Sequence, residues 1–318
     1  MNRMKTNPRM KKGAASLWAN AYILLCFTAL FWAGNSIVGR AARDLVPPVS
    51  LAFWRWLLAL VLLLPLAWPH LKRDWPELKA NWRIMLLLGI LGIGAFNTLL
   101  YTGLQTTTAL NSLLLQAAQP ALILSMGVIL MRDSVSARQI AGLVISLAGV
   151  LAIISQGNVT ALLNLNLNEG DGIIAFAVLL WSVYAVMLRR RPIIHPLSFL
   201  AATLVIGVIF IAPFYVVEIA SGRLIIPSAE TYLAIGYVAI FPSFIAYLFY
   251  NRGVELIGSA ATGQFMNILP VMGAGLAMLF LGERLYAFHI AGIALIFAGI
   301  FIAGKHGSAQ TSQSGRPL

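Results

Sequence analysis

The sequence predicts an all-α polytopic membrane protein with ten transmembrane helices, and three observations support this fold class. Hydrophobic residues make up 60% of the 318-residue chain and charged residues only 10%, with a mean hydropathy of +0.86. Because soluble domains carry about 25% charged residues, lipid must solvate much of this surface. Apolar runs of membrane-spanning length recur along the chain, and its two halves repeat one another.

The first predicted element is a basic tail, residues 1–18, followed by an apolar run at 19–39. A secretory signal peptide has the same order of charge and apolar residues. Asn35 and Arg40 interrupt the region after the apolar centre, where a small-residue cleavage site would have to lie. We therefore expect an uncleaved first helix behind a cytoplasmic tail.

Nine further apolar runs follow, joined by short connections that mostly contain proline or charged residues. They lie at residues 48–68, 83–102, 108–130, 137–156, 171–189, 196–217, 230–250, 259–281 and 286–304. The longest polar connection, an extracytoplasmic linker at 157–170, divides the chain almost in half. The Ser-, Gln- and Gly-rich tail at 305–318 is predicted to be disordered and cytoplasmic.

The distribution of basic residues predicts the orientation. With a cytoplasmic N-terminus, 17 of the 22 Lys and Arg residues fall in the tails and connections on the cytoplasmic side and four on the other side. This bias follows the positive-inside rule and requires an even number of spans, so both termini are expected in the cytoplasm. It also accounts for the net charge of +12 without a nucleic-acid partner. The expected location is a bacterial cytoplasmic (inner) membrane, with the lipid bilayer as partner and the chain as a monomer or homodimer.

An internal repeat supports the same count. A shift of 150 residues places Gly103 on Gly253, Pro120 on Pro270 and Asp133 on Glu283. Each half then holds five helices, residues 19–156 and 171–304. Because an odd number of spans reverses direction across the membrane, the two repeats are inverted relative to one another.

Together these features resemble the drug/metabolite transporter superfamily, specifically its EamA-type family. The resemblance rests on Phe31-Trp32-Ala33-Gly34-Asn35, on Phe53-Trp54-Arg55-Trp56-Leu57-Leu58-Ala59, and on the repeated order of a mid-helix proline, an acidic residue and spaced glycines. It implies ten helices, two inverted repeats, a central substrate cavity and export of amino acids, metabolites or drugs. Asp133 departs from the glutamate usual in the family, which we interpret as a conservative change.

Arg55 is the sharpest single candidate for function, because it lies about seven residues inside the second apolar run. A charge at membrane depth costs about 2.5–3.5 kcal/mol or more and usually faces a cavity or a partner. It can anchor a carboxylate or phosphate of a substrate. Alternatively, it can extend to the outer interface or bind helix-end carbonyls as a packing device.

Polar amides within apolar runs are the next candidates for substrate binding, because a bilayer offers them no partner. They are Asn35, Asn97, Gln116, Gln119, Gln264 and Asn267. Four of them stand just before Pro120 or Pro270, where a proline opens the helix. We expect this region to line a cavity, although bonding between helices is the alternative.

Aromatic residues within the runs can stack on a substrate ring or hold an ammonium group, or belong to interfacial belts. The candidates are Trp32, Tyr101, Trp181, Tyr184 and Tyr247. Four glycines, Gly142, Gly149, Gly292 and Gly299, are expected to permit close helix packing. Together with the two prolines they can also allow bending during transport.

The sequence favours transport over catalysis. It contains no His-Glu-x-x-His or Gly-x-Ser-x-Gly motif, and its single cysteine, Cys26, excludes an internal disulfide and a multi-cysteine metal site. We predict no cofactor and no metal. All ten acidic residues lie in connections or near helix ends, so none is an obvious proton carrier. The expected function is alternating-access export or exchange of amino acids or related small polar metabolites, with efflux of drugs or other organic solutes, or a non-transporting sensor, as alternatives.

Overall fold

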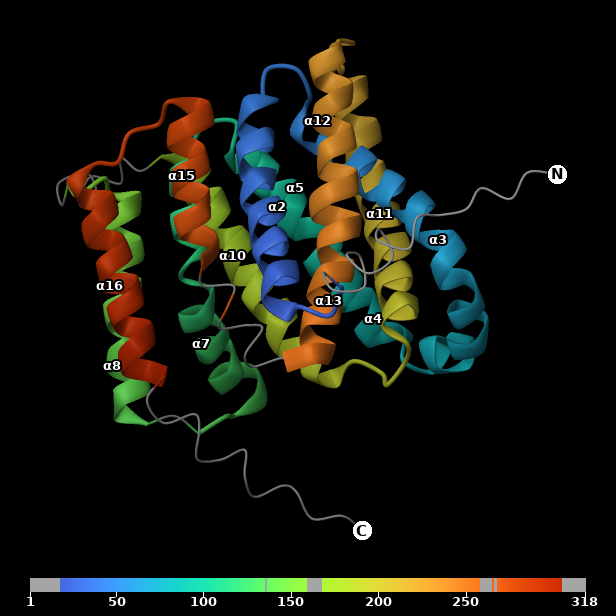
Figure 1. Ribbon diagram of the computed structural model, residues 1–318, viewed down its shortest axis with the longest axis horizontal. Helices are drawn as coiled ribbons and strands as arrows, with labels where there is room; N and C mark the ends of the chain where they lie inside the picture. The colour runs from blue at the N-terminus through green and yellow to red at the C-terminus, as the bar shows by residue number, and fades with distance from the viewer. Residues whose placement is uncertain (1–17, 135, 159–167, 258–264, 266–267, 305–318) are drawn as a thin grey trace.

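The computed structural model describes residues 18–134, 136–158, 168–257, 265 and 268–304, and all the regular secondary structure in these ranges is helical. Figure 1 shows the helices as a bundle. The helices before residue 158 are α2 (Ala21–Ala41), α3 (Pro48–Ala80), α4 (Trp82–Leu88), η1 (Gly89–Ala95), α5 (Phe96–Gly103), α6 (Ala109–Gln116), α7 (Gln119–Met131) and α8 (Ala137–Ile154). Those after residue 168 are α10 (Glu169–Met187), η2 (Leu188–Arg190), α11 (Pro196–Ala220), α12 (Ala229–Ala239), η3 (Ile240–Ile245), α13 (Ala246–Ile257), α15 (Leu269–Leu281) and α16 (Ala287–Gly304).

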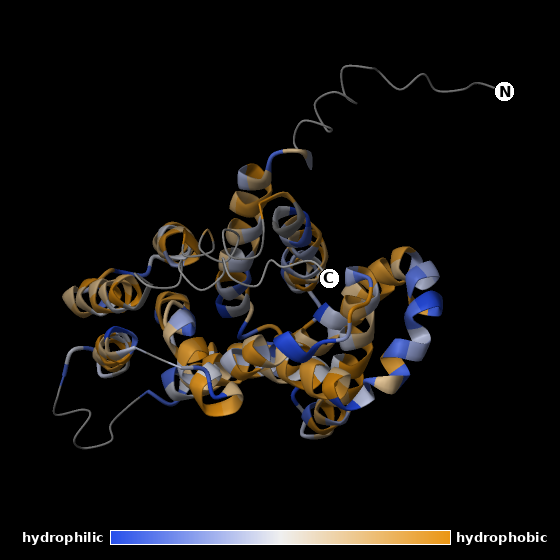
Figure 2. Cartoon of the chain, turned by 90° about the horizontal axis from the view of Figure 1, so that it is seen from below, coloured by the Kyte–Doolittle hydropathy of each residue, from blue (hydrophilic) through white to orange (hydrophobic). Residues whose placement is uncertain are grey.

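In the part of the chain that the structure describes, six continuous helical segments are long and apolar enough to cross a membrane. They are Ala21–Ala41, Pro48–Ala80, Trp82–Gly103, Glu169–Arg190, Pro196–Ala220 and Ala229–Gly253. A seventh is the pair α6 and α7, and α8, α15 and α16 are shorter apolar helices. Hydrophobic residues dominate most of these helices (Figure 2). The structure thus confirms an all-helical membrane protein with six or seven such spans, whereas the count of ten stays a prediction.

Side-chain caps define where several helices begin. The side chain of Asn20 accepts hydrogen bonds from the backbone N–H groups of Tyr22 and Ile23 at the start of α2. Ser136 and Gln139 form a reciprocal capping box at the start of α8. These caps satisfy N–H groups that have no partner within a helix, so α2 and α8 each begin at a defined residue.

The predicted helix at 108–130 is not a single rod, which corrects the sequence analysis. α6 ends at Gln116 and α7 begins at Gln119, with a bend of 43° between them. Pro120 lies in the first turn of α7, where the missing N–H of a proline does no harm. The proline therefore begins a new helix and leaves Ala117 and Ala118 as a joint.

The predicted helix at 48–68 is also longer than expected: α3 continues to Ala80, through Pro69 and Pro76. Two other runs contain π-helical segments, η1 and η3. A shift of 150 residues places η1 on residues 239–245, almost the range of η3, so the two halves share this irregularity. Such π segments free backbone groups and are frequent at functional sites.

α3 and α11 pack along one another, and a carboxylate joins them at each end. Glu218, near the end of α11, accepts hydrogen bonds from the backbone of Val49 and Ser50 at the start of α3. Asp74, on α3, accepts one from the backbone of His195 at the start of α11. Helix N-termini favour negative charge, so each helix stabilises the start of the other.

α8 and α16 form the other close pair, at the opposite side of the bundle in Figure 1. A Cβ atom added at Gly149 would meet the backbone oxygen of Gly292, and one added at Gly299 would meet that of Gly142. The hydroxyl of Ser146 also donates to the backbone oxygen of Ile296. In this structure the four glycines therefore let two backbones approach closely.

We expect Gly299→Ala to destabilise the protein by about 1–3 kcal/mol, because overpacking forces neighbouring atoms to shift. Thermal unfolding of the purified protein in detergent measures the effect. Gly275→Ala is the matched control: its added Cβ meets nothing within 4 Å. Equal unfolding temperatures for the two variants would contradict the close packing of α8 and α16.

Candidate functional site

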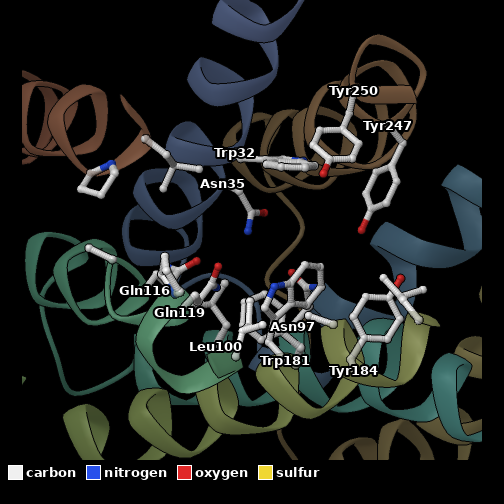
Figure 3. A pocket seen from close by; sticks show the side chains of 18 of the residues that line it. Trp32, Asn35, Asn97, Leu100, Gln116, Gln119, Trp181, Tyr184, Tyr247 and Tyr250 are labelled. Carbon is white, nitrogen blue, oxygen red and sulfur yellow. The ribbon is translucent and has the colours of Figure 1, made fainter. Parts of the chain in front are cut away.

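A cavity of about 350 Å³ lies among the helices of both halves. Figure 3 shows the labelled side chains pointing toward one another across it: Trp32, Asn35, Tyr247 and Tyr250 from α2 and α13 on one side, and Asn97, Leu100, Gln116, Gln119, Trp181 and Tyr184 on the other. Arg55 of α3 also lines the cavity. Ligand pockets usually measure about 300–1,000 Å³, so this space suits a small solute.

Arg55 is only 3% exposed and is held by side chains from three other helical segments. Its Nη1 donates to Asn35 Oδ1, Asn97 Oδ1 and the Tyr101 hydroxyl, each at 2.7 Å. Its Nε donates to the Ser243 hydroxyl at 2.5 Å. The alternative of an arginine that extends to the membrane interface therefore does not describe this structure.

The partners of Arg55 are themselves fixed in place. The Tyr101 hydroxyl donates to Asn35 Oδ1 at 2.5 Å. Ser243 lies within the π segment η3, and its hydroxyl donates to the backbone oxygen of Val238 at 2.6 Å. The guanidinium also lies over the ring of Trp56, 4.4 Å from its centroid. The geometry of the guanidinium is thus set before any ligand arrives.

The charge of Arg55 has no counterion among the described residues. Their salt bridges join Arg43 to Asp44, Arg73 to Asp74 and Arg189 to Asp133, and the described residues that line the cavity include no carboxylate. The four hydrogen-bond partners of Arg55 among the described residues are all neutral. A buried positive charge that faces a cavity in this way is electrostatically suited to an anionic group.

Aromatic rings form much of the remaining wall. The indole N–H of Trp32 donates to the backbone oxygen of Pro242, and its ring lies 5.4 Å from that of Tyr250 and 5.8 Å from that of Tyr247. Opposite, the rings of Trp181 and Tyr184 are 4.9 Å apart. Such rings can stack on an apolar part of a solute or hold an ammonium group.

The structure brings most of the predicted site residues together. Those that line the cavity are Trp32, Asn35, Arg55, Asn97, Gln116, Gln119, Trp181, Tyr184 and Tyr247, together with Pro120 and Pro270. Tyr101 lies behind Arg55 and is fully buried. Gln264 and Asn267 fall outside the described residues. Gly142, Gly149, Gly292 and Gly299 lie in the α8–α16 contact, away from the cavity lining. A role of any of them in substrate binding stays a prediction.

Sequence reasoning missed Ser243 and Phe96, and it did not commit to Tyr250 as a site residue. Ser243 follows Pro242 in an apolar run, and this pair of residues was the available signal of an interrupted helix. Phe96 and Tyr250 line the cavity, but aromatic residues in apolar runs are too common for sequence alone to place them there.

The two ends of the cavity differ. The residues of α10 and its continuation that line it, Trp181 to Leu188, all lie in the C-terminal half of that helix. At the start of α6, near the other end of α10, hydrogen bonds join several elements. Arg40 donates to the backbone oxygens of Leu104 and Gln105, and Glu283 accepts from the backbone N–H groups at the start of α6. The cavity lining does not extend to these residues, and we therefore treat this end, where polar contacts join the elements, as the closed end.

Comparison with known proteins decides the family. The sequence profile of the EamA-like transporter family matches residues 19–155 and again residues 168–304. The chain belongs to the EamA-like transporter family. The resemblance seen in the sequence is thereby confirmed, and this EamA-family chain has a membrane-transport role.

Curated relatives agree with this assignment. The uncharacterized transporter YyaM of Bacillus subtilis is 30% identical over 290 residues, which cover 89% of this chain and 93% of YyaM. YetK of the same organism is 26% identical, covering 93% of this chain and 91% of YetK, and an uncharacterized transporter of Archaeoglobus fulgidus is 26% identical, covering 89% and 97%. A solved crystal structure matches with a TM-score of 0.60 at 19% identity, covering 89% of this chain and 96% of that one. At that identity it shows the fold alone.

Proposed function

We propose that this EamA-family protein exports or exchanges amino acids or related small carboxylated metabolites across a bacterial cytoplasmic (inner) membrane by alternating access. Its working unit is a bundle of ten transmembrane helices in two inverted five-helix repeats, residues 19–156 and 171–304. Among the described residues, the six continuous apolar spans, the bent pair of α6 and α7 and the three shorter apolar helices support this architecture, as does the double match to the family profile.

We infer a carboxylated substrate from the buried charge of Arg55, which no described residue compensates. A carboxylate that entered the cavity would supply the counterion that the described residues do not. Hydrogen bonds with an ionised donor or acceptor are about twice as strong as neutral ones, and a carboxylate can in addition pair with a guanidinium through two parallel bonds. The neutral groups around Arg55 hold the guanidinium without cancelling its charge, which leaves its attraction for an anion available.

The rest of the cavity suits the remainder of an amino acid. The amides of Gln116 and Gln119 and the faces of Trp32 and Tyr247 surround the same space. Aromatic faces attract an ammonium group by about 0.5–2 kcal/mol, and they also accept an apolar side chain. The volume of about 350 Å³ limits the solute to a small metabolite.

A paired ligand screen tests the role of the carboxylate. Purified protein is warmed with single amino acids and with their amides, in which a neutral amide replaces the negatively charged carboxylate. A ligand that binds the native state raises the unfolding temperature, so we expect amino acids to stabilise the protein and their amides to do so less. Uptake of the stabilising solutes into proteoliposomes then tests transport.

Arg55→Gln should lower uptake of a carboxylated substrate at least about tenfold, which corresponds to about 1.4 kcal/mol of lost interaction. It should also remove the preference for the amino acid over its amide. This preference is the ratio of the responses to the amino acid and to its amide in one variant, so it can be measured even if the variant is less stable. A variant that keeps the wild-type preference would refute Arg55 as the anion anchor.

The aromatic wall favours one alternative, efflux of larger apolar organic solutes. Stabilisation and flux of such solutes, without any effect of amino acids, would select it. Binding without flux of any tested solute would instead indicate a membrane sensor.

A further inference from the structure

A second buried polar cluster lies outside the substrate cavity, at the closed end of the bundle. It consists of Thr107, Asn111, Asp171 and His289, which are between 0% and 4% exposed. The Thr107 hydroxyl donates to Asp171 Oδ1, and Asn111 Nδ2 lies 3.2 and 3.1 Å from the two carboxylate oxygens of Asp171. Asn111 Oδ1 lies 2.9 Å from His289 Nε2. The cluster thus joins α6, α10 and α16.

The hydrogen bonds assign the proton on the histidine. His289 Nδ1 accepts from the backbone N–H of Tyr286 at 3.1 Å, so the ring proton must lie on Nε2, where it is donated to Asn111. A second proton on Nδ1 would break the bond to Tyr286. The ring is therefore neutral in this arrangement, and the amide of Asn111 is oriented with its NH₂ group toward Asp171.

Among the described residues, no cation pairs with Asp171. Around it, the Glu169 side chain on the same helix is exposed, Glu283 is bound to the start of α6, and Arg40 is bound to two backbone oxygens. The other described elements packed on α10 carry their charged groups, Arg83, Arg132, Arg189 and Arg190, at its far end. Buried carboxylates without a cation are commonly neutralised by a proton. The attraction of a helix N-terminus for a negative charge is smaller than the cost of removing that charge from water.

We propose that Asp171 is a proton-binding site whose occupancy controls the opening of this end of the transporter. With a proton bound, the acid is neutral and the cluster closes dry, with the Thr107 hydroxyl still donating to Oδ1. When the proton leaves to water on this side, the carboxylate requires hydration, and α6 must move to admit it. The substrate need not change chemically, because only one O–H bond forms or breaks.

α6 is the element that links this site to the cavity. Asn111 stands near its start and Gln116, which lines the cavity, at its end. The joint at Ala117 and Ala118, with its 43° bend, allows this short helix to turn without moving α7. Because one rigid helix carries both residues, movement at the proton site changes the cavity. Only this coupling between the proton site and the cavity rests on the proposed transport function.

The site is tested without any organic substrate, by infrared difference spectroscopy of the full-length protein in lipid nanodiscs between about pH 5 and pH 9. We expect a band of a protonated carboxylic acid that disappears as the pH rises. Asp171→Asn should abolish this band, whereas Glu169→Gln, two residues away and exposed, should keep it. His289→Gln should also keep it, although its midpoint can shift.

Hydrogen–deuterium exchange tests the opening. Peptides covering residues 104–111 should exchange at least about tenfold faster in wild-type protein than in Asp171→Asn at the alkaline end, and at equal rates at the acidic end. Comparison at one pH removes the intrinsic pH dependence of exchange. A band that survives in Asp171→Asn, no band in wild-type protein, or equal exchange at all pH values would overturn the proposal. Because neither measurement uses a substrate, these outcomes are independent of whether Arg55 anchors a carboxylate.

Discussion

Asn35→Leu is expected to destabilise the protein by about 3–5 kcal/mol, although it replaces a polar residue in an apolar helix with a better helix former. Asn35 Oδ1 accepts hydrogen bonds from both Arg55 Nη1 and the Tyr101 hydroxyl. Removing it leaves a buried charged donor short of one acceptor, which costs more than the loss of a neutral bond. Unfolding of the purified protein in detergent, by heat or by added denaturing detergent, measures the change.

A double-mutant cycle separates this electrostatic cost from loss of packing. Arg55→Met removes the charge, so Asn35→Leu introduced beside it no longer leaves a charged donor unsatisfied. We expect the double variant to be more stable than the sum of the single changes by about 1–3 kcal/mol. Additive effects would show that Arg55 and Asn35 do not depend on one another.

The result of this double-mutant cycle also bears on the role of Arg55 in the cavity. Three neutral acceptors on one nitrogen fix the guanidinium, yet they leave its net charge intact. This arrangement separates the two tasks of an anion site, positioning and attraction. If the cycle shows strong coupling while Arg55→Gln retains wild-type substrate preference, the arginine is structural and the carboxylate must bind elsewhere.

The apolar pattern of the sequence predicted the helical class and nearly all the segments that the structure describes, because burial in lipid demands long apolar runs. We expected the helix to open at Pro120, but the pattern did not show that α6 already ends at Gln116 and that a new helix begins at Gln119. A proline inside an apolar run is compatible with a kinked helix, a broken helix or a straight one, and tertiary contacts decide among them.

Part of the candidate site could also be predicted from the sequence. Polar residues inside apolar runs, such as Asn35 and Asn97, point inward because lipid cannot satisfy them, and the structure gathers them around Arg55. Asp171 was placed at a helix end, where exposure is the ordinary expectation. Its complete burial depends on Thr107 and Asn111, which are more than 50 positions away in sequence and could not be paired with it by spacing.

Glu218→Ala should have an effect of similar size on stability, about 3 kcal/mol, because Glu218 is 5% exposed and joins the two halves. Its carboxylate accepts from the backbone N–H groups of Val49 and Ser50, at 3.1 and 2.6 Å, and from the Ser50 hydroxyl at 2.7 Å. Alanine would leave all three donors unpaired at the start of α3. Thermal unfolding in detergent is again the measurement, with the exposed Glu230→Ala as control, which should unfold near the wild-type temperature.

The contacts of Glu218 and Asp74 between α3 and α11 also bear on how the transporter moves. With Glu218 at one end and Asp74 at the other, α3 and α11 are tied together at both N-termini. α6, by contrast, is bounded by the joint at Ala117 and by the proposed proton site. We therefore expect α3 and α11 to keep their contact through the transport cycle, while α6 changes its contacts. A Glu218→Ala variant as stable as wild-type protein would remove the reason to treat α3 and α11 as the fixed pair.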